Sequence, residues 1–340
     1  EANADYVLVG PGSKELMFLL QLVFYGEIIV PTPCWVSYVP QAQILGKRVS
    51  LLHTSFEDKW HIRADRLSEL LEGEKDTYRP RLLVLNYPGN PDGLTYTANE
   101  LKEIAEVARE YELILLSDEI YGQLHHRGGH VSVARFYPEG TIISSGLSKW
   151  CGAGGWRLGT FTFPRSLDWL MDAMAAVASE TYTSVSAPIQ YAAIEAFRGS
   201  MVIERYLWHA RRILSVLGQK CYRMLSDAGV RLHSPEGAFY MFPDFSPFAR
   251  ELAKKNIKTS KQLCEKLFQE TAVAMLPGRV FERPCEELTA RISYINFSGA
   301  KSLAASETIA IHHELPAEFI QAHCEETLRG MEILTEWLTS

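Results

Sequence analysis

The chain lacks the cysteine patterns that crosslink small secreted domains or bind zinc. Its six cysteines stand singly, and no two form a Cys-x-x-Cys pair. This usage is typical of proteins in a reducing compartment, so we expect a cytoplasmic protein without a disulfide framework. The adjacent histidines His125-His126 and His312-His313 would point apart on a helix or strand, and we therefore expect no metal site.

Long apolar runs and an excess of basic residues are missing as well. The longest apolar stretch, from Leu16 to Tyr25, is interrupted by Gln21 and is too short to span a bilayer. A net charge of −7 argues against the basic stripe that binds nucleic acid. Neither Gly-x-x-x-x-Gly-Lys-Ser/Thr nor Gly-x-Gly-x-x-Gly occurs, which weighs against nucleoside triphosphate and dinucleotide ligands. We therefore expect neither a membrane nor a nucleic acid as a partner.

Short apolar strands alternate with helical segments from residue 6 to about residue 165, which predicts a doubly wound α/β domain with a mostly parallel sheet. A long helical tract over 201–227 then leads into a second domain. We place a large α/β domain at 1–205 and a smaller C-terminal α+β domain at 206–340. In the second domain we expect strands at 238–242, 272–276 and 291–295, and a closing helix at 316–338.

Glycine-rich and polar segments follow several predicted strands, where open α/β sheets bind ligands. The turn Gly10–Ser13 leads into a helix, whose N-terminal N–H groups form a natural phosphate seat. Asn90 is held between prolines after the strand at 81–85. Asp118 and Glu119 follow the strand at 113–116, and they either place charge for chemistry or cap a helix.

The stretch from Ser144 to Gly159 combines a lysine, an arginine and five glycines, four of which precede Gly159. A poorly solvated Lys149 could form a Schiff base with an aldehyde cofactor. Arg157 could hold a phosphate through two parallel hydrogen bonds. Taken alone, the stretch would also suit a surface loop with a solvated lysine.

In this order the motifs resemble those of class I/II aminotransferases, pyridoxal phosphate enzymes of the aspartate aminotransferase type. The resemblance implies the type I fold and transfer of an amino group from an L-amino acid to a 2-oxo acid. It also implies a homodimer for the full-length protein. A lyase or decarboxylase on the same cofactor, or a non-catalytic aminotransferase-like regulatory domain, remains an alternative. The matching residues are Asn90-Pro91-x-Gly93, Ser117-Asp118-Glu119-Ile120-Tyr121, Ser148-Lys149, Gly155-Trp156-Arg157-Leu158-Gly159 and Arg291-Ile292-Ser293.

The resemblance also implies roles for the residues around the cofactor ring. Lys149 would hold pyridoxal phosphate as a Schiff base and move the substrate proton as general base and then acid. Asp118 would pair with the ring nitrogen and keep it protonated. Tyr121 and Asn90 would hydrogen-bond the phenolic oxygen of the ring, and Trp35 would stack on its face.

The resemblance further implies that the cofactor phosphate is bound by Arg157 and by Gly12 and Ser13 at the start of the helix. Many relatives place a serine or threonine three residues before the lysine; here that residue is Gly146, and Ser145 and Ser148 are nearby candidates for its role. The chain begins only a few residues before the phosphate turn, where relatives carry a long segment. We therefore expect a fragment whose small domain lacks its N-terminal part.

Substrate binding would fall to Arg291, which would clamp the α-carboxylate in a bidentate fork, together with Asn90 and Trp35. Lys14 stands where some similar aspartate aminotransferases meet the distal carboxylate of the substrate. It could equally face solvent or the cofactor phosphate. No arginine occurs in 179–190, where other relatives place a side-chain arginine, so acidic and aromatic amino acids both remain possible donors.

Overall fold

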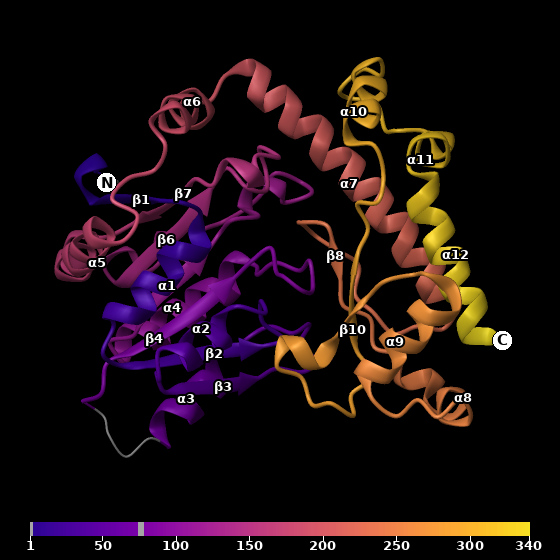
Figure 1. The fold of residues 1–340 in the computed structure, drawn as a ribbon, viewed down its shortest axis with the longest axis horizontal. Coiled ribbons are helices and arrows are strands. Elements are labelled where there is room, and N and C mark those ends of the chain that lie inside the picture. The colour runs from indigo at the N-terminus through magenta and orange to yellow at the C-terminus, as the bar shows by residue number, and fades with distance from the viewer. Residues whose placement is uncertain (1–2, 74–77) are drawn as a thin grey trace. The chain divides into compact units, whose positions relative to one another are not determined.

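A computed structural model of the protein describes residues 3–73 and 78–340 (Figure 1). The chain forms two units. Unit 1 comprises Glu1–Tyr87, Tyr96–Gln123 and His130–Ile203, and unit 2 comprises Pro88–Thr95, Leu124–Gly129 and Glu204–Ser340. Two short loops thus belong to unit 2, although they lie within the first 205 residues of the sequence.

Unit 1 is built on a seven-stranded sheet with the strand order β1-β7-β6-β5-β4-β2-β3. Strands β2 to β6 are parallel, whereas β7 runs antiparallel to both β6 and β1. The predicted α/β class with a large, mostly parallel sheet is confirmed. The strands are β1 (Val7–Gly10), β2 (Glu27–Thr32), β3 (Val49–His53), β4 (Arg81–Asn86), β5 (Ile114–Asp118), β6 (Thr141–Gly146) and β7 (Gly159–Thr162).

Two apolar clusters bury the two faces of this sheet. Leu82 of β4 belongs to the cluster that contains residues of α1, α2 and α5, whereas its neighbour Leu83 belongs to the cluster with α3 and α4. Because successive residues of a strand point to opposite faces, a continuous apolar run such as β4 needs a covering layer on each side. The helices of unit 1 are α1 (Ser13–Val23), α2 (Tyr38–Ile44), α3 (Ala64–Glu72), α4 (Ala98–Glu110), α5 (Asp168–Glu180) and α6 (Ala187–Arg198).

Helix α4 begins with the capping box that the motif Thr97-x-x-Glu100 predicts. The Thr97 hydroxyl accepts from the backbone N–H of Glu100, and the Glu100 carboxylate accepts from the backbone N–H of Thr97. These two bonds satisfy N–H groups that have no partner within the helix. The long helix predicted over 201–227 is present as α7 (Met201–Asp227).

Unit 2 contains an antiparallel sheet in the order β8-β10-β9, flanked in sequence by helices. The strand expected over 238–242 is shorter, since Ala238 has a φ of 52°. The strand expected from 272 begins only at Leu276, because Ala272 adopts a left-handed conformation at the end of a helix. The elements are β8 (Tyr240–Met241), β9 (Leu276–Pro277), β10 (Ala290–Ser293), α8 (Ala249–Lys254), α9 (Ser260–Thr271), α10 (Gly299–Glu307), α11 (Ala317–His323) and α12 (Glu325–Thr339).

The expected closing helix is in fact two helices. Cys324, with a φ of −133°, interrupts the helical backbone between α11 and α12 and is almost fully buried. An amphipathic pattern cannot reveal such a break, because both helices keep apolar residues at helical spacing. Within residues 3–73 and 78–340, no helix combines the length and the apolar character needed to cross a membrane.

Candidate active site

The polar residues of unit 1 meet at the carboxyl-terminal edge of its parallel strands. Asp118, the last residue of β5, pairs in register with Ser144 of β6 on one side and with Asn86 of β4 on the other. Lys149 follows β6 a few residues later. The edge where parallel strands end is the usual place for ligands in such sheets.

A cradle of close backbone contacts forms where α1 begins. A Cβ atom at Gly159 would lie 2.3 Å from the backbone nitrogen of Ser13, so β7 approaches α1 as only glycine allows. Gly12 has a φ of 98°, and a Cβ atom there would lie 2.1 Å from Nη2 of Arg157. The Arg157 guanidinium, whose Nη1 donates to the carbonyl of Gly154 at 2.8 Å, therefore lies against the first turn of α1. A guanidinium beside a helix N-terminus suits an anion.

The strand pairing explains why no hydroxyl residue stands three positions before Lys149. A Cβ atom at Gly146 would lie 2.7 Å from the carbonyl oxygen of Leu158, closer than side chains are found in proteins. A serine or threonine would therefore force β6 away from β7. Ser145 and Ser148 are both half-buried and stay the candidates for that hydroxyl.

Asp118 is a buried carboxylate with two hydroxyl donors. Its side chain accepts from the Tyr38 hydroxyl at 2.6 Å and from the Ser144 hydroxyl at 3.2 Å, and the residue is 4% exposed. Burial raises the pKa of Asp118 to about 6, although both hydrogen bonds work in the opposite direction. Burial also raises the pKa of Tyr38 well above its usual value. The sequence analysis did not identify Tyr38 as a site residue; its only signal is its position at the start of α2.

Two lysines of unit 1 lie against aromatic rings. Nζ of Lys14 is 5.1 Å from the centroid of the Trp35 ring, and Trp35 meets Tyr38 edge-on at 5.2 Å between ring centroids. Nζ of Lys149 is 5.6 Å from the centroid of the buried Tyr121 ring. Ammonium groups are attracted to aromatic faces at such distances. Tyr38 thus connects Trp35 with Asp118, and Lys149 lies beside Tyr121.

The two remaining expected residues, Asn90 and Arg291, belong to unit 2 and contact each other. Nη1 of Arg291 donates to Oδ1 of Asn90 at 2.9 Å. The guanidinium carbon lies 4.7 Å from the Tyr240 ring centroid and 5.2 Å from that of Phe281. Nε is buried and has no hydrogen-bond partner among the described residues. Because a buried N–H group without an acceptor costs free energy, this guanidinium is suited to a carboxylate ligand.

The loop that carries Asn90 is fixed by its turn chemistry. Gly93 has a φ of 72°, and a Cβ atom there would lie 2.3 Å from the carbonyl oxygen of Tyr240. Oδ1 of Asp92 accepts from the backbone N–H of Leu94 at 2.8 Å. Asp92 therefore stabilises the turn, which accounts for the Asn-Pro-Asp-Gly form of the motif.

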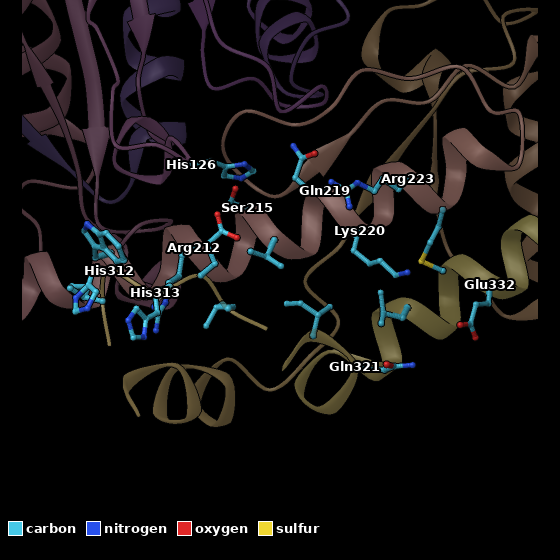
Figure 2. Close-up of a pocket in the computed structure, with 18 residues that line it drawn as sticks. His126, Arg212, Ser215, Gln219, Lys220, Arg223, His312, His313, Gln321 and Glu332 are labelled. Carbon is cyan, nitrogen blue, oxygen red and sulfur yellow. Dashed lines mark hydrogen bonds between the residues drawn. The ribbon is translucent and has the colours of Figure 1, made fainter. Parts of the chain in front are cut away.

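A cavity of about 720 Å³ lies within unit 2, and none of the predicted site residues lines it (Figure 2). Its wall includes Arg212, Lys220 and Arg223. Arg212 is already engaged, because it donates to four carbonyl oxygens at and beyond the end of α10. These belong to Ser306, Ile309, Ala310 and His313. That arginine therefore stabilises a helix terminus.

Comparison with known proteins gives consistent results. The model for "Aminotransferase class I and II" matches residues 1–305. An aspartate aminotransferase of Bacillus sp. (strain YM-2) is 32% identical over 302 residues, which cover 86% of this chain and 73% of that protein. Aromatic-amino-acid aminotransferase 2 of Thermococcus litoralis is 30% identical over 296 residues, covering 85% and 70%. The Thermus thermophilus aspartate aminotransferase structure with maleate has a TM-score of 0.79 at 26% identity and covers 98% of this chain and 76% of that chain. The aromatic aminotransferase structure from Pyrococcus horikoshii has a TM-score of 0.81 at 26% identity, covering 100% and 81%.

The buried charge of Asp118 predicts a pH dependence of stability. Its pKa is about 6 in the folded protein against the usual 3.8, so its contribution to the free energy of unfolding is lost as the pH rises from about 4 through 6. The difference corresponds to about 3 kcal/mol. Asp118→Asn removes this titration. In urea unfolding without added cofactor, the stability of the variant relative to wild type should rise by that amount between pH 4 and pH 8.

The exposed Asp172→Asn on α5 is the control, and its stability relative to wild type should change little between the two pH values. An Asp118→Asn difference that is the same at pH 4 and pH 8 would show that the carboxylate is not a buried charge.

Proposed function

Because the chain belongs to the class I and II aminotransferase family and is a pyridoxal phosphate-dependent transaminase, we propose that its unit 1 residues hold the cofactor and carry the proton transfer. The observation that carries this proposal is the buried Asp118 at the sheet edge that also bears Lys149. Unit 1 would be the large domain and unit 2 the small domain of the enzyme, with the boundary near the start of α7.

The side chains of unit 1 fit pyridoxal phosphate by their chemistry. The start of α1 and the adjacent Arg157 offer N–H groups and positive charge to a phosphate. Asp118 is a carboxylate whose burial makes a cationic partner favourable, as a protonated pyridine nitrogen would be. When bound, the cofactor supplies an aldehyde that bonds to amines and a ring that withdraws electrons. Trp35 offers an aromatic face for such a ring.

We infer the following roles for the residues themselves. Lys149 would hold the cofactor through Nζ until the amine of the substrate displaces it, and the freed Nζ would then accept the proton from the substrate Cα as general base. Tyr121 donates a hydrogen bond from its hydroxyl to the cofactor. Tyr38 and Ser144 orient the Asp118 carboxylate and stabilise its ionised form, because each donates to one of its oxygens.

The substrate is an amino acid and the acceptor a 2-oxo acid. We propose that Arg291 binds the α-carboxylate of the substrate, with Asn90 fixing the guanidinium; the support is its buried Nε without a partner among the described residues. Lys14 would bind the distal carboxylate of an acidic donor such as aspartate. The alternative is an aromatic donor, as in one of the relatives, since Trp35 and Tyr38 supply aromatic surface.

Lys149→Ala tests the assignment of the cofactor lysine. The purified variant, incubated with pyridoxal phosphate and reduced with borohydride, should show no covalent adduct by mass spectrometry, and it should have no measurable transaminase activity. The control is Lys220→Ala, an exposed lysine of unit 2, which should retain both. An undiminished adduct in Lys149→Ala would assign the cofactor to another amine.

A comparison of amino donors distinguishes the substrate-binding roles of Arg291 and Lys14. Arg291→Ala should raise the KM of every amino donor about 100-fold, because it removes charged hydrogen bonds to a group common to all. Lys14→Ala should raise KM about tenfold for aspartate and glutamate but change it less than about twofold for phenylalanine. A panel of donors with 2-oxoglutarate as acceptor measures both. Equal losses for all donors in Lys14→Ala would exclude its specificity role.

We also propose that the protein is a cytoplasmic homodimer. Its six cysteines are all free thiols, which supports a reducing compartment. Of the residues in α6, only Ala193 is buried, whereas Tyr191 and Ile194 are 74% and 48% exposed. The neighbouring Met201 is 84% exposed. We infer that these exposed side chains form an apolar face that a second copy of the chain would cover.

Ile194→Glu should shift the protein from dimer to monomer in sedimentation equilibrium, because it places a charge in that apolar face. Phe268→Glu on α9, which also replaces an exposed apolar side chain, is the matched control and should remain dimeric. A wild-type protein that sediments as a monomer at all concentrations would contradict the proposal.

A further inference from the structure

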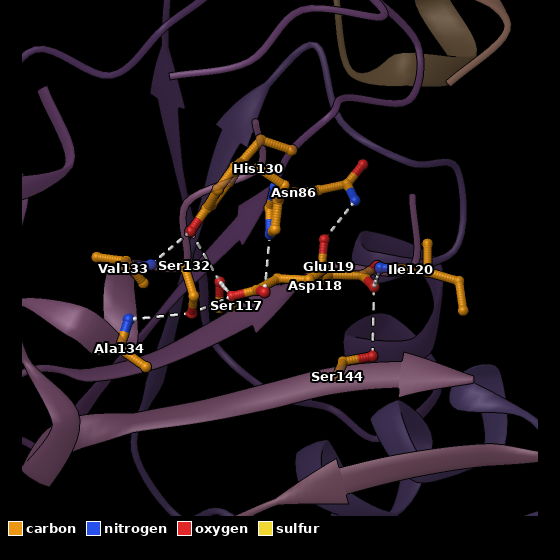
Figure 3. A network of polar contacts seen from close by, with 11 residues as sticks. Asn86, Ser117, Asp118, Glu119, Ile120, His130, Ser132, Val133, Ala134 and Ser144 are labelled. Atoms are coloured by element: carbon orange, nitrogen blue, oxygen red, sulfur yellow. Dashed lines mark hydrogen bonds and ion pairs between the residues drawn. The ribbon is translucent and has the colours of Figure 1, made fainter. Parts of the chain in front are cut away.

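Glu119, the neighbour of Asp118, forms a polar network of its own (Figure 3). Its Oε2 lies 2.8 Å from Nε2 of His130. Its Oε1 accepts from the hydroxyls of Ser117, at 2.8 Å, and of Ser132. The side chains of Glu119 and His130 are only 11% and 16% exposed. One carboxylate therefore has three donors in a largely buried setting, where such bonds are strong.

This network holds the turn that connects Asp118 to Tyr121. The backbone N–H of Glu119 donates to the carbonyl of Ser144 at 3.0 Å, and its carbonyl accepts from the N–H of Gly122 at 2.8 Å. Gly122 lies directly against the imidazole, since a Cβ atom there would be 2.9 Å from Cδ2 of His130. His130 thus contacts the turn at two points, through the Glu119 carboxylate and through Gly122.

The residues that flank this network are held by hydrogen bonds of their own. Ser132 accepts from the backbone N–H of Ala134 at 3.2 Å and so caps a short helical turn. The buried Tyr87 hydroxyl accepts from the N–H of Val133 at 2.8 Å and lies 3.2 Å from the Ser117 hydroxyl. The Tyr87 ring lies 5.3 Å from the His130 ring, between centroids. The donors around Glu119 are therefore fixed in place before any ligand binds.

We propose that Glu119 and His130 are positioning residues for the reaction: their hydrogen bond fixes the Asp118–Tyr121 turn so that both flanking side chains keep their orientation toward the cofactor. This inference rests on the roles proposed above for Asp118 and Tyr121. Small displacements of such groups are expensive, because a shift of about 1 Å in a reacting arrangement can lower the rate about 100-fold. Removing one partner of the pair would leave the other poorly satisfied in a buried place.

The test compares this pair with a second histidine–glutamate pair of unit 1. Nδ1 of His61 lies 3.1 Å from Oε1 of Glu100, and His61 is similarly buried. Glu119→Gln and His130→Gln are made beside Glu100→Gln and His61→Gln. Each of the four changes alters one histidine–glutamate hydrogen bond and roughly preserves side-chain size, so a loss of stability alone should affect both sets.

The first measurement is hydrogen exchange in protein without cofactor. The amides of Glu119 and Gly122 should exchange about tenfold faster in Glu119→Gln and His130→Gln, and at the wild-type rate in the two control variants. The second measurement is kinetic. With pyridoxal phosphate bound, kcat should fall about tenfold or more while KM for the amino donor changes little. The double variant Glu119→Gln/His130→Gln should lose no more than either single variant, because the two residues act as one unit.

The proposal is overturned if these amides keep their wild-type exchange rates, or if kcat falls equally in the control pair. Should the Glu119 variants fail to fold, Ser132→Ala removes one donor and leaves the contact between Glu119 and His130, and it should produce the same pattern with smaller changes. Failure of the proposed function can be distinguished from failure of this positioning role. An adduct that persists in Lys149→Ala would overturn the catalytic assignment, whereas the exchange result without cofactor reports on the turn alone.

Discussion

The arrangement of unit 1 depends on one buried charge, the Asp118 carboxylate at the end of β5. Few carboxylates are tolerated at 4% exposure, and burial raises the pKa of this one to about 6. Tyr38 and Ser144 offset only part of the cost of burial with their hydroxyl hydrogen bonds. A cationic partner, such as a protonated pyridine nitrogen, would offset the remaining cost, and this is the physical basis of the role proposed for Asp118.

A second constraint is steric and comes from β7. This strand lies between β1 and β6, and its first residue, Gly159, approaches the start of α1 within contact distance of the backbone. The same closeness excludes a side chain at Gly146 and brings the Arg157 guanidinium beside Gly12. The close pairing of β6 and β7 thus leaves no room for a hydroxyl-bearing side chain at Gly146, and the phosphate site that we propose consists of the start of α1 and Arg157.

The fold class and most of the candidate site residues could be predicted from the sequence. The strands are recognisable as apolar runs, and the candidate residues follow directly after them. The α/β class, the capping box of α4 and the bounds of α7 were predicted correctly for the same reason: each depends on local pattern. The partnership of Tyr38 with Asp118 could not be predicted, because 80 positions separate them and only the sheet order brings them together. The break between α11 and α12 at Cys324 was not predicted, because a single non-helical residue leaves the apolar periodicity of the sequence intact.

The adjacent carboxylates Asp118 and Glu119 show why a motif is more than its most reactive member. A strand directs successive side chains to opposite sides, so only Asp118 meets Tyr38, while Glu119 meets His130 and Ser132. The protein supplies donors to both carboxylates. The hydroxyls of Tyr38 and Ser144 and the N–H of Ile120 donate to Asp118, and the hydroxyls of Ser117 and Ser132 donate to Glu119, which also contacts His130. Burial raises the pKa of Asp118 to about 6 in spite of its donors, so a cationic ligand would be favourable beside it.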